Sequence, residues 1–290
     1  MSNVPELLRV GTGFALSAVD PAGTPGLPEK KTVRKDPKTW AREQLVDLGA
    51  QLATQQEMLF ATAKADPKDK RRLLLVLQAM DCGGKDGTVK KVAGTMNPQG
   101  LHIVGFGPPT ATELRHDFLW RIHRALPKPG LVGVFNRSHY EDVLVVRVRK
   151  LAPKRVWLSR YPQINDFEQE LADAGVTLVK VMLHISFEEQ QRRLLERLRD
   201  PTKFWKYSPA DVDNRAYWPA YQEAYHDALA HCSTDLAPWY VVPADRKWYR
   251  DWAVAHLMLH AFKGMNLQYP PANFDPQRER QRIEEGVSQT

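Results

Sequence analysis

Cysteine is scarce in this sequence, with only Cys82 and Cys232 among 290 residues. One disulfide at most would be a poor framework for a chain of this length, so the cysteine count favours the reducing cytoplasm. Long apolar runs are missing as well, since no uninterrupted stretch approaches the ~20 residues that a membrane-spanning helix needs. The first residues lack the basic, apolar and small-residue succession of a signal peptide. We therefore expect a cytoplasmic protein with no membrane partner.

Acidic residues are fewer than basic ones, 34 against 41, which gives a net charge of +7. An excess of positive charge suits a polyanion such as nucleic acid, an acidic membrane or a phosphate chain, and does not choose among them. The hydrophobic content of 43% and the charged content of 26% are typical of a globular protein. A length of 290 residues fits one α/β domain with appendages better than two independent cores.

One stretch combines a strand, a glycine-containing loop and a helix. The apolar residues 73–77 predict a buried strand, and a helix-like segment begins at about Thr88. The loop between them contains Gly83, Gly84, Lys85 and Gly87. Glycines let backbone N–H groups turn toward an anion, and the new helix directs its unpaired N–H groups and positive dipole end to the same place. We therefore predict a phosphate-binding loop in which Lys85 supplies a positive charge for a terminal phosphate.

The match of this loop to the Walker A pattern is imperfect. Ala79 stands in place of the first glycine, and Asp86 in place of the hydroxyl residue. Asp81 and Asp86 also bring two carboxylates into the loop, and carboxylates repel a phosphate unless a divalent cation lies between them. The loop therefore predicts a metal–phosphate site with Asp81 and Asp86 as metal ligands. The alternative is an ordinary glycine turn before a helix.

Strand-like and helix-like segments alternate along the rest of the chain. Strands are predicted at 73–77, 102–106, 131–135, 176–185 and 239–242, and helices at 37–63, 110–125, 162–174, 187–199, 209–229 and 247–265. The segment 142–148 fits a strand or a helix, and this choice stays open. Five strands with helices between them predict a three-layer α/β/α fold with a parallel sheet, which binds ligands at the carboxyl ends of its strands. This phosphate-loop kinase-like domain is expected over 37–265, between a loosely held basic arm at 1–36 and a tail at 266–290.

Polar side chains follow the third predicted strand directly. Asn136 ends this strand, where phosphate-loop enzymes usually place a carboxylate that faces the metal. Arg137 can reach a phosphate as a planar fork. His139 fits a base or, more often for a lone histidine in a turn, a simple hydrogen-bonding residue. The turn therefore predicts a second set of site residues beside the glycine loop.

Residues 186–218 form a second concentration of positive charge. The predicted helix at 187–199 carries several arginines, and the break at Asp200-Pro201 is followed by Lys203, Phe204, Trp205, Lys206 and Tyr207. Two helices joined by a basic, aromatic turn after the fourth strand are typical of a kinase lid. A lid excludes water and neutralises the charge that spreads over a transferring phosphoryl group. The alternative is a solvated basic helix face.

Three motifs together resemble the polyphosphate kinase 2 family, and the resemblance covers about residues 36–264. The motifs are Gln78-Ala-Met-Asp-Cys-Gly-Gly-Lys-Asp-Gly-Thr88, Phe135-Asn-Arg-Ser-His-Tyr-Glu-Asp142 and Arg197-Leu-Arg-Asp-Pro-Thr-Lys-Phe-Trp-Lys206. Members of this family are similar to thymidylate kinases in fold and carry a helical lid. They move a terminal phosphate between inorganic polyphosphate and a nucleotide with Mg²⁺, for which Mn²⁺ is a possible substitute.

The resemblance implies a role for each group of site residues. Asp81, Lys85 and Arg137 are implied to be catalytic, with Asp81 holding the metal or activating the acceptor phosphate. The implied phosphate-binding residues are Gly83, Gly84, Asp86, Gly87, Thr88, Arg193, Arg197, Lys203 and Lys206. The implied nucleotide-binding residues are Asn136, His139, Tyr140 and Glu141. The Asn-Arg-Ser-His-Tyr-Glu form is similar to the subgroup that accepts both AMP and ADP.

The function expected from these residues is reversible phosphate transfer from polyphosphate to AMP and ADP. An ADP-only polyphosphate kinase and an ATP-dependent nucleotide kinase are the alternatives, and a non-enzymatic nucleic-acid binder is a remote one. The missing first glycine and the basic excess count against an ATP donor. A nucleic-acid binder leaves Asp81 and Asp86 unexplained. We expect polyphosphate, adenine nucleotides and Mg²⁺ as ligands, no nucleic acid, and a homo-oligomer.

Overall fold

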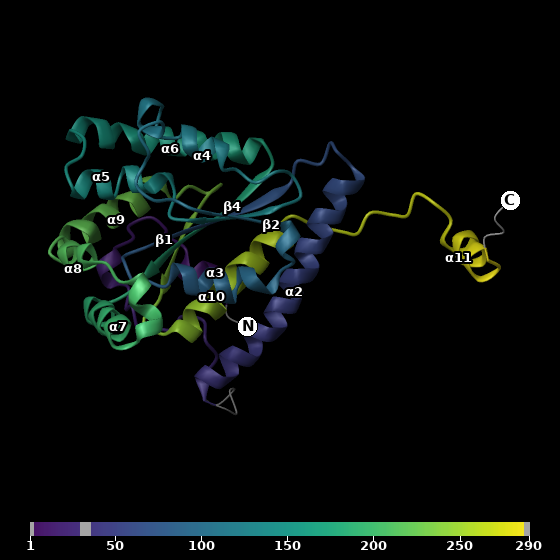
Figure 1. The fold of residues 1–290 in the computed structure, drawn as a ribbon, viewed down its shortest axis with the longest axis horizontal. Helices are drawn as coiled ribbons and strands as arrows, with labels where there is room; N and C mark the ends of the chain where they lie inside the picture. The colour runs from purple at the N-terminus through teal and green to yellow at the C-terminus, as the bar shows by residue number, and fades with distance from the viewer. Residues whose placement is uncertain (1–2, 30–35, 287–290) are drawn as a thin grey trace.

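Five parallel strands form the centre of the protein, in the order β2-β3-β1-β4-β5 (Figure 1). The computed structural model describes residues 3–29 and 36–286. The strands are β1 (Arg72–Ala79), β2 (Leu101–Gly105), β3 (Val132–Asn136), β4 (Val176–His184) and β5 (Trp239–Pro243). Four of the strands are buried almost throughout and read as nearly continuous apolar runs, whereas β2 lies at the sheet edge with partly exposed residues. The five-stranded parallel sheet and the α/β class are confirmed.

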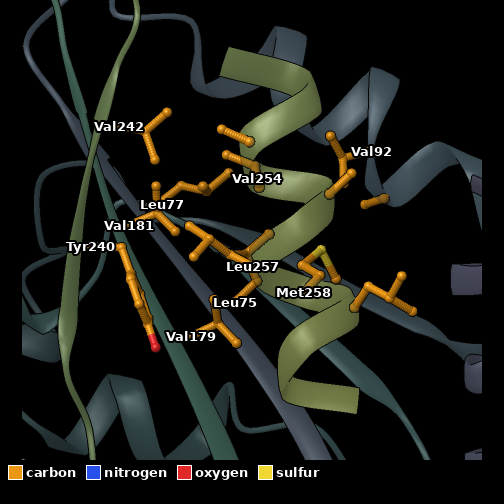
Figure 2. Close-up of a cluster of buried hydrophobic side chains, with 14 of the residues drawn as sticks. Leu75, Leu77, Val92, Val179, Val181, Tyr240, Val242, Val254, Leu257 and Met258 are labelled. Carbon is orange, nitrogen blue, oxygen red and sulfur yellow. The ribbon is translucent and has the colours of Figure 1, made fainter. Parts of the chain in front are cut away.

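One face of the sheet packs against α3 (Lys85–Lys91) and α10 (Lys247–Gly264), and α2 (Pro37–Ala65) forms the layer outside them. Figure 2 shows how Leu75 and Leu77 of β1 and Val181 of β4 point toward Leu257 and Met258 of α10. Helix α2 lies against the outer side of α10, so α10 is buried nearly all round. This cluster supports the strand ends and the helix starts that surround the glycine loop.

The other face is covered by α4 (Trp120–Arg124), α5 (Val145–Val148), α6 (Lys154–Asp173) and α9 (Trp218–Cys232) (Figure 1). Leu74 and Val76 of β1 point into this second apolar cluster, because side chains alternate between the two faces of a strand. The choice between strand and helix for residues 142–148 is resolved in favour of helix. Helix α5 is preceded by a 3-10 turn, η5 (His139–Asp142).

The lid segment contains α7 (Phe187–Arg199), the 3-10 helix η6 (Pro201–Lys206) and α8 (Pro209–Arg215). The Ser186, Asp200 and Ser208 side chains accept bonds from backbone N–H groups at the starts of these three elements. The predicted helical pair with a basic turn is therefore present. The single helix predicted over 209–229 is wrong, because α8 ends at Arg215 and α9 begins at Trp218. Pro219 restricts the residue before it and supports a new helix start there.

Two other helix predictions differ from the structure. The segment 110–125 contains only η4 (Glu113–Arg115) and α4, because the backbone becomes extended at His116 and the Asp117 side chain starts a new turn. The helix predicted from residue 162 begins earlier, at Lys154, and Pro162 lies inside α6. Gly175, with a φ of 85°, ends this helix as predicted.

The amino-terminal segment packs on the body. Val4 and Leu8 of the short helix α1 (Val4–Leu8) are buried, and Arg9 forms an antiparallel bridge with Tyr240 of β5. The prediction of a loosely held arm over 1–36 is therefore corrected for residues 3–29. Apolar side chains of this arm pack against β5 at the edge of the sheet and against α10, although the arm contains several prolines and glycines. The basic run at 30–35 lies outside the described residues.

The carboxyl-terminal segment extends away from the body and ends in α11 (Pro276–Glu284) (Figure 1). Among the helices of the described ranges, none combines the length and the apolar character that crossing a bilayer requires.

Candidate active site

The glycine loop is shaped by an arginine from the far end of the chain. Gly84 precedes α3 with a φ of 105°, which glycine adopts without strain. A Cβ atom on Gly84 would overlap Nη1 of Arg250, and one on Gly87 would lie 2.8 Å from its Nη2. Both glycines are thus required by the close approach of the α10 guanidinium. Sequence reasoning missed Arg250, because nothing near residue 250 marks it as part of a loop formed by residues 81–88.

Arg250 is a buried cation, 3% exposed, and its charge is only partly neutralised. Its Nε and Nη2 donate to Oδ1 of Asp251 at 2.9 and 2.7 Å. Burial lowers the pKa of Arg250, and the Asp251 carboxylate opposes this shift. The guanidinium therefore adds positive potential beneath the loop, where the positive end of α3 already favours an anion.

Lys85 is buried at the first position of α3. Its Nζ donates to the backbone carbonyl of Ala79 at 3.0 Å, and no carboxylate of the described residues lies within ion-pair distance. Burial lowers the pKa of Lys85, the nearby Arg137 lowers it further, and Asp81 and Glu141 oppose them. The ammonium is therefore placed beside the cavity with a neutral partner, which suits it to receive a phosphate.

Asp81 connects the loop to two other segments. Its carboxylate accepts from Nη2 of Arg137 at 3.1 Å and from Nδ2 of Asn214 in α8 at 3.3 Å. Its backbone carbonyl accepts from Nε2 of Gln190 in α7 at 3.0 Å. The loop, the turn after β3 and the lid therefore meet at one carboxylate. Asn214 and Gln190 were not predicted, because neither lies in a recognisable phosphate motif.

Asp86 is the more exposed of the two loop carboxylates, with 65% of its side chain accessible. Nδ2 of Asn136 donates to its Oδ1 at 2.8 Å, and Nζ of Lys206 lies 3.9 Å from Oδ2. The predicted contact between the glycine loop and the end of β3 is thus made by a neutral amide. A carboxylate at position 136 would face Asp86 at the same distance and would require a cation between them.

Arg137 holds a strained backbone conformation at the start of the turn after β3. Its φ is 65°, in the left-handed region that non-glycine residues rarely adopt. Its Nη1 lies 3.9 Å from Oε2 of Glu141, and its Nη2 bonds to Asp81. Burial raises the pKa of Glu141, and the Arg137 charge opposes this shift. With the Gln78 amide nitrogen turned toward it, Oε1 of Glu141 accepts a hydrogen bond at 3.0 Å.

His139 and Tyr140 point away from the cavity, and their predicted contact with the nucleotide is corrected. Both are fully buried and bond to Oε1 of Glu168 in α6, at 3.3 Å from Nε2 of His139 and 2.8 Å from the Tyr140 hydroxyl. Lys180 of β4 completes this cluster through contacts with Glu168, Tyr140 and the Cys232 carbonyl. The turn after Arg137 directs both side chains toward α6, so adjacency to Arg137 in a motif did not place them in the site.

The four basic lid residues differ in how they are held. Arg193 is buried, and it donates from Nε to Glu189 at 2.6 Å and from Nη1 to the Cys82 carbonyl at 2.8 Å. Arg197 donates from Nη1 to the Lys206 carbonyl and to Asp211. Lys203 and Lys206 are about one-third exposed and form only surface pairs. Arg193 therefore supports the loop directly, whereas the two lysines remain free to turn toward a ligand.

These groups surround one cavity of about 540 Å³ at the carboxyl ends of the strands. The predicted residues that line it are Asp81, Gly83, Gly84, Lys85, Asp86, Gly87, Asn136, Arg137, Arg193, Arg197, Lys203 and Lys206. Lys247, Arg250 and Asp211 line it as well and were not predicted. Thr88, His139, Tyr140 and Glu141 do not line it; the buried Thr88 hydroxyl has no hydrogen-bond partner within the described ranges.

The carboxylates of the cavity fit a divalent cation of the magnesium type. The described residues contain no cluster of three or more acidic, histidine or cysteine side chains that could enclose a metal. Mg²⁺ is usually held by one or two carboxylates together with substrate phosphates and water, so a full protein cage is not required. Asp81 and Asp86 both face the cavity and can supply such ligands.

Comparison with known proteins identifies the family of this chain. The family model described as Polyphosphate kinase 2 matches residues 43–270. An AMP/ADP-polyphosphate phosphotransferase from Meiothermus ruber is 46% identical over 84% of this chain and 89% of its own length. An ADP-polyphosphate phosphotransferase from Rhodopseudomonas palustris is 41% identical over 76% of this chain and 78% of its own length. The crystal structure of Polyphosphate Kinase 2 from Arthrobacter aurescens is 48% identical and superposes with a TM-score of 0.92 over 98% of this chain and 97% of that one. The glycine loop, the strained turn and the basic lid therefore belong to a member of the polyphosphate kinase 2 family.

Proposed function

We propose that this enzyme transfers the terminal phosphate of inorganic polyphosphate to AMP, giving ADP, and to ADP, giving ATP. The observation that carries this proposal is the cavity, in which a phosphate-binding loop faces a lid rich in cations across two carboxylates. The relatives from Meiothermus ruber and Rhodopseudomonas palustris, whose names specify polyphosphate with AMP/ADP and with ADP, support the donor and the acceptors.

The transfer forms one P–O bond and breaks another. An oxygen of the terminal phosphate of the nucleotide attacks the terminal phosphorus of the polyphosphate. The bond from that phosphorus to the bridging oxygen breaks, and its electron pair stays on the shortened chain. Phosphoryl transfer relies mainly on positioning and charge stabilisation, so Lys85, Arg137 and the loop amides are the groups that lower the barrier.

Asp81 has the central role among the acidic groups. Its contacts with Arg137 and Asn214 fix the carboxylate between the loop, the turn and the lid. Together with Asp86 it would hold Mg²⁺, or Mn²⁺ in its place, near the phosphates. Such a cation, when bound, neutralises the negative charge that both substrates bring to the cavity. Asp81→Asn should melt close to the wild type and lose several orders of magnitude in rate.

Asn136 favours acceptance of both nucleotides. AMP and ADP differ by one phosphate and by about one to two negative charges near neutral pH. A neutral amide at the end of β3 adds no repulsion toward either acceptor, and its bond to Asp86 holds that carboxylate in place. We expect Asn136→Asp to shift the ratio of the two rates by roughly 1–3 kcal/mol and to raise the need for metal.

The proposal is tested by analysing products with purified protein. Polyphosphate and ATP are each offered as donor, with AMP and ADP as separate acceptors and Mg²⁺ or Mn²⁺ present, and nucleotides are separated by chromatography. Polyphosphate should convert AMP to ADP and ADP to ATP. Turnover of ADP alone would identify an ADP-only enzyme, and turnover with ATP but not polyphosphate would overturn the donor.

Assembly and compartment extend the proposal. Helix α2 offers a long outer face, so we expect a homo-oligomer that light scattering would detect. Both cysteines are free thiols in the structure, in keeping with a reducing cytoplasm. The domain limits of 37–265, with a tail from 266, are proposed as the unit required for activity.

A further inference from the structure

A second cavity of about 890 Å³ lies on the other side of the glycine loop, between α2, α3 and α10. We call it the α2–α3 groove. Its positively charged lining residues are Arg42 from α2, Lys90 and Lys91 from α3, and Lys247 and Arg250 from α10. One acidic side chain, Asp251, also lines it and is bonded to Arg250. When this ion pair is counted as neutral, the other lining cations still give the groove an excess of positive charge.

The α2–α3 groove adjoins the active-site cavity. Gly87, Lys247 and Arg250 line both of them. Arg250 is nearly fully buried at this junction, with its guanidinium against Gly84 and Gly87. A chain of phosphates that starts in the loop would pass this arginine before it reaches Lys90 and Lys91.

The junction between the two cavities is crowded with like charges. Burial lowers the pKa of Lys247; Glu196, whose Oε2 lies 3.9 Å from Nζ, opposes this shift, and Arg193, Arg192 and Arg250 add to it. An anion that binds among crowded cations stabilises their charged forms. A nucleoside would leave most of these cations without an anionic partner, whereas a phosphate chain carries negative charge along its whole length.

We propose that the α2–α3 groove holds the distal phosphates of a long polyphosphate whose reacting end lies in the active-site cavity. This inference rests on the proposed donor. The consequence is that affinity for the donor rises with chain length until the chain fills the groove. Short chains end in the active-site cavity and gain nothing from Lys90, Lys91 or Arg42.

The test compares Lys90→Ala/Lys91→Ala with a control pair in the full-length enzyme. The control is Lys154→Ala/Arg155→Ala, two adjacent exposed cations on α6 at the opposite face of the sheet. Initial rates are measured with saturating AMP and polyphosphates of defined lengths, from short oligophosphates to long polymers, at several salt concentrations.

We expect the groove variant to raise the KM for long polyphosphate by on the order of tenfold at low salt and to leave kcat unchanged. The slope of log KM against log salt should fall by roughly 0.7 for each lost phosphate contact. KM for short oligophosphates and for AMP should stay as in the wild type, and the control pair should change neither. An equal rise for all chain lengths, or an equal effect of the control pair, would overturn the groove assignment. Failure of polyphosphate to support turnover in the wild type would instead overturn the donor itself.

Discussion

Two sets of one lysine and one glutamate lie inside this protein: Lys180 with Glu168, and Lys85 with Glu141. Their charges are compensated very differently. Lys180 and Glu168, on the α6 side of the sheet, are in direct contact, and the Tyr140 hydroxyl and the Cys232 carbonyl fill the remaining positions around the ammonium. Lys85, beside the active-site cavity, donates to the neutral Ala79 carbonyl. Glu141 lies 3.9 Å from the Arg137 guanidinium.

The pKa directions express the same difference. Burial lowers the pKa of Lys85 and raises that of Glu141, so each charged form is disfavoured where it stands. Burial also pushes the pKa of Glu168 upward, but the Lys180 ammonium and His139 outweigh it and leave that pKa lowered. The structural pair is thus complete within the protein. The charges of the active site become favourable only when phosphates and a cation arrive, which is typical of functional sites.

Replacing each lysine by methionine gives the largest expected contrast. Lys85→Met should reduce kcat by about a thousandfold or more, because a phosphate loses its cation. Its melting temperature should equal or exceed that of the wild type, since a buried charge with a neutral partner is removed. Lys180→Met should instead lose about 3–5 kcal/mol of stability, because Glu168 is left buried without a counter-charge.

Calorimetry and steady-state rates on the same preparations measure both effects. The control is Lys180→Met/Glu168→Gln, which removes both charges and should recover stability. Activity of Lys85→Met within tenfold of the wild type, or an unchanged melting temperature for Lys180→Met, would contradict the comparison.

A double-mutant cycle asks whether the structural pair also serves the active site. Glu168 binds His139 and Tyr140, which directly follow the strained turn at Arg137. Glu168→Gln should lower kcat by roughly 10–100-fold through this turn and leave KM for AMP nearly unchanged. In an Arg137→Ala background the same change should lower stability by the same amount but not lower kcat further. Equal factors in kcat in both backgrounds would show that Glu168 does not act through Arg137.

Stability against pH should change in opposite directions at the two glutamates. The raised pKa of Glu141 means that the folded protein binds more protons than the unfolded chain just above the ordinary carboxyl pKa, so stability falls as pH rises through that window. The lowered pKa of Glu168 means that its stabilisation is present above the ordinary pKa and is lost as pH falls below it. Urea unfolding at several pH values should show that Glu141→Gln removes the first dependence and Glu168→Gln the second. Parallel changes in the two variants would contradict the assigned directions.

The smallest effect is expected at the tip of the lid. Nζ of Lys203 lies 2.9 Å from Glu196 and 3.0 Å from Asp200, and exposed pairs of this kind contribute little to stability. Lys203→Ala should therefore melt like the wild type and raise the KM for polyphosphate a few-fold. A rise in the KM for AMP with unchanged polyphosphate kinetics would assign this lysine to the other substrate.

The sequence predicted the parts of the fold and site that depend on short, continuous patterns. The apolar runs of the five strands and the glycines before Lys85 are local signals, and both were found as predicted. Arg250 and Asn214 could not be predicted, because their roles come from contacts across 100 residues or more of chain. For His139, the hydrogen-bonding role agrees with the structure and the nucleotide contact does not, because a motif does not tell which way each side chain of a turn points.

The root and the tip of the lid are joined to the body with unequal firmness. Arg193 binds the Cys82 carbonyl on one side and the Ala244 carbonyl on the other, whereas η6 is held by exposed pairs. Farther along the lid, Asn214 of α8 donates to the Asp81 carboxylate, so the segment is fastened to the glycine loop on both sides of η6. Lys203 and Lys206 thus lie on a bridge between two fixed supports, where a substitution changes the charge beside the cavity and leaves both attachments of the lid in place.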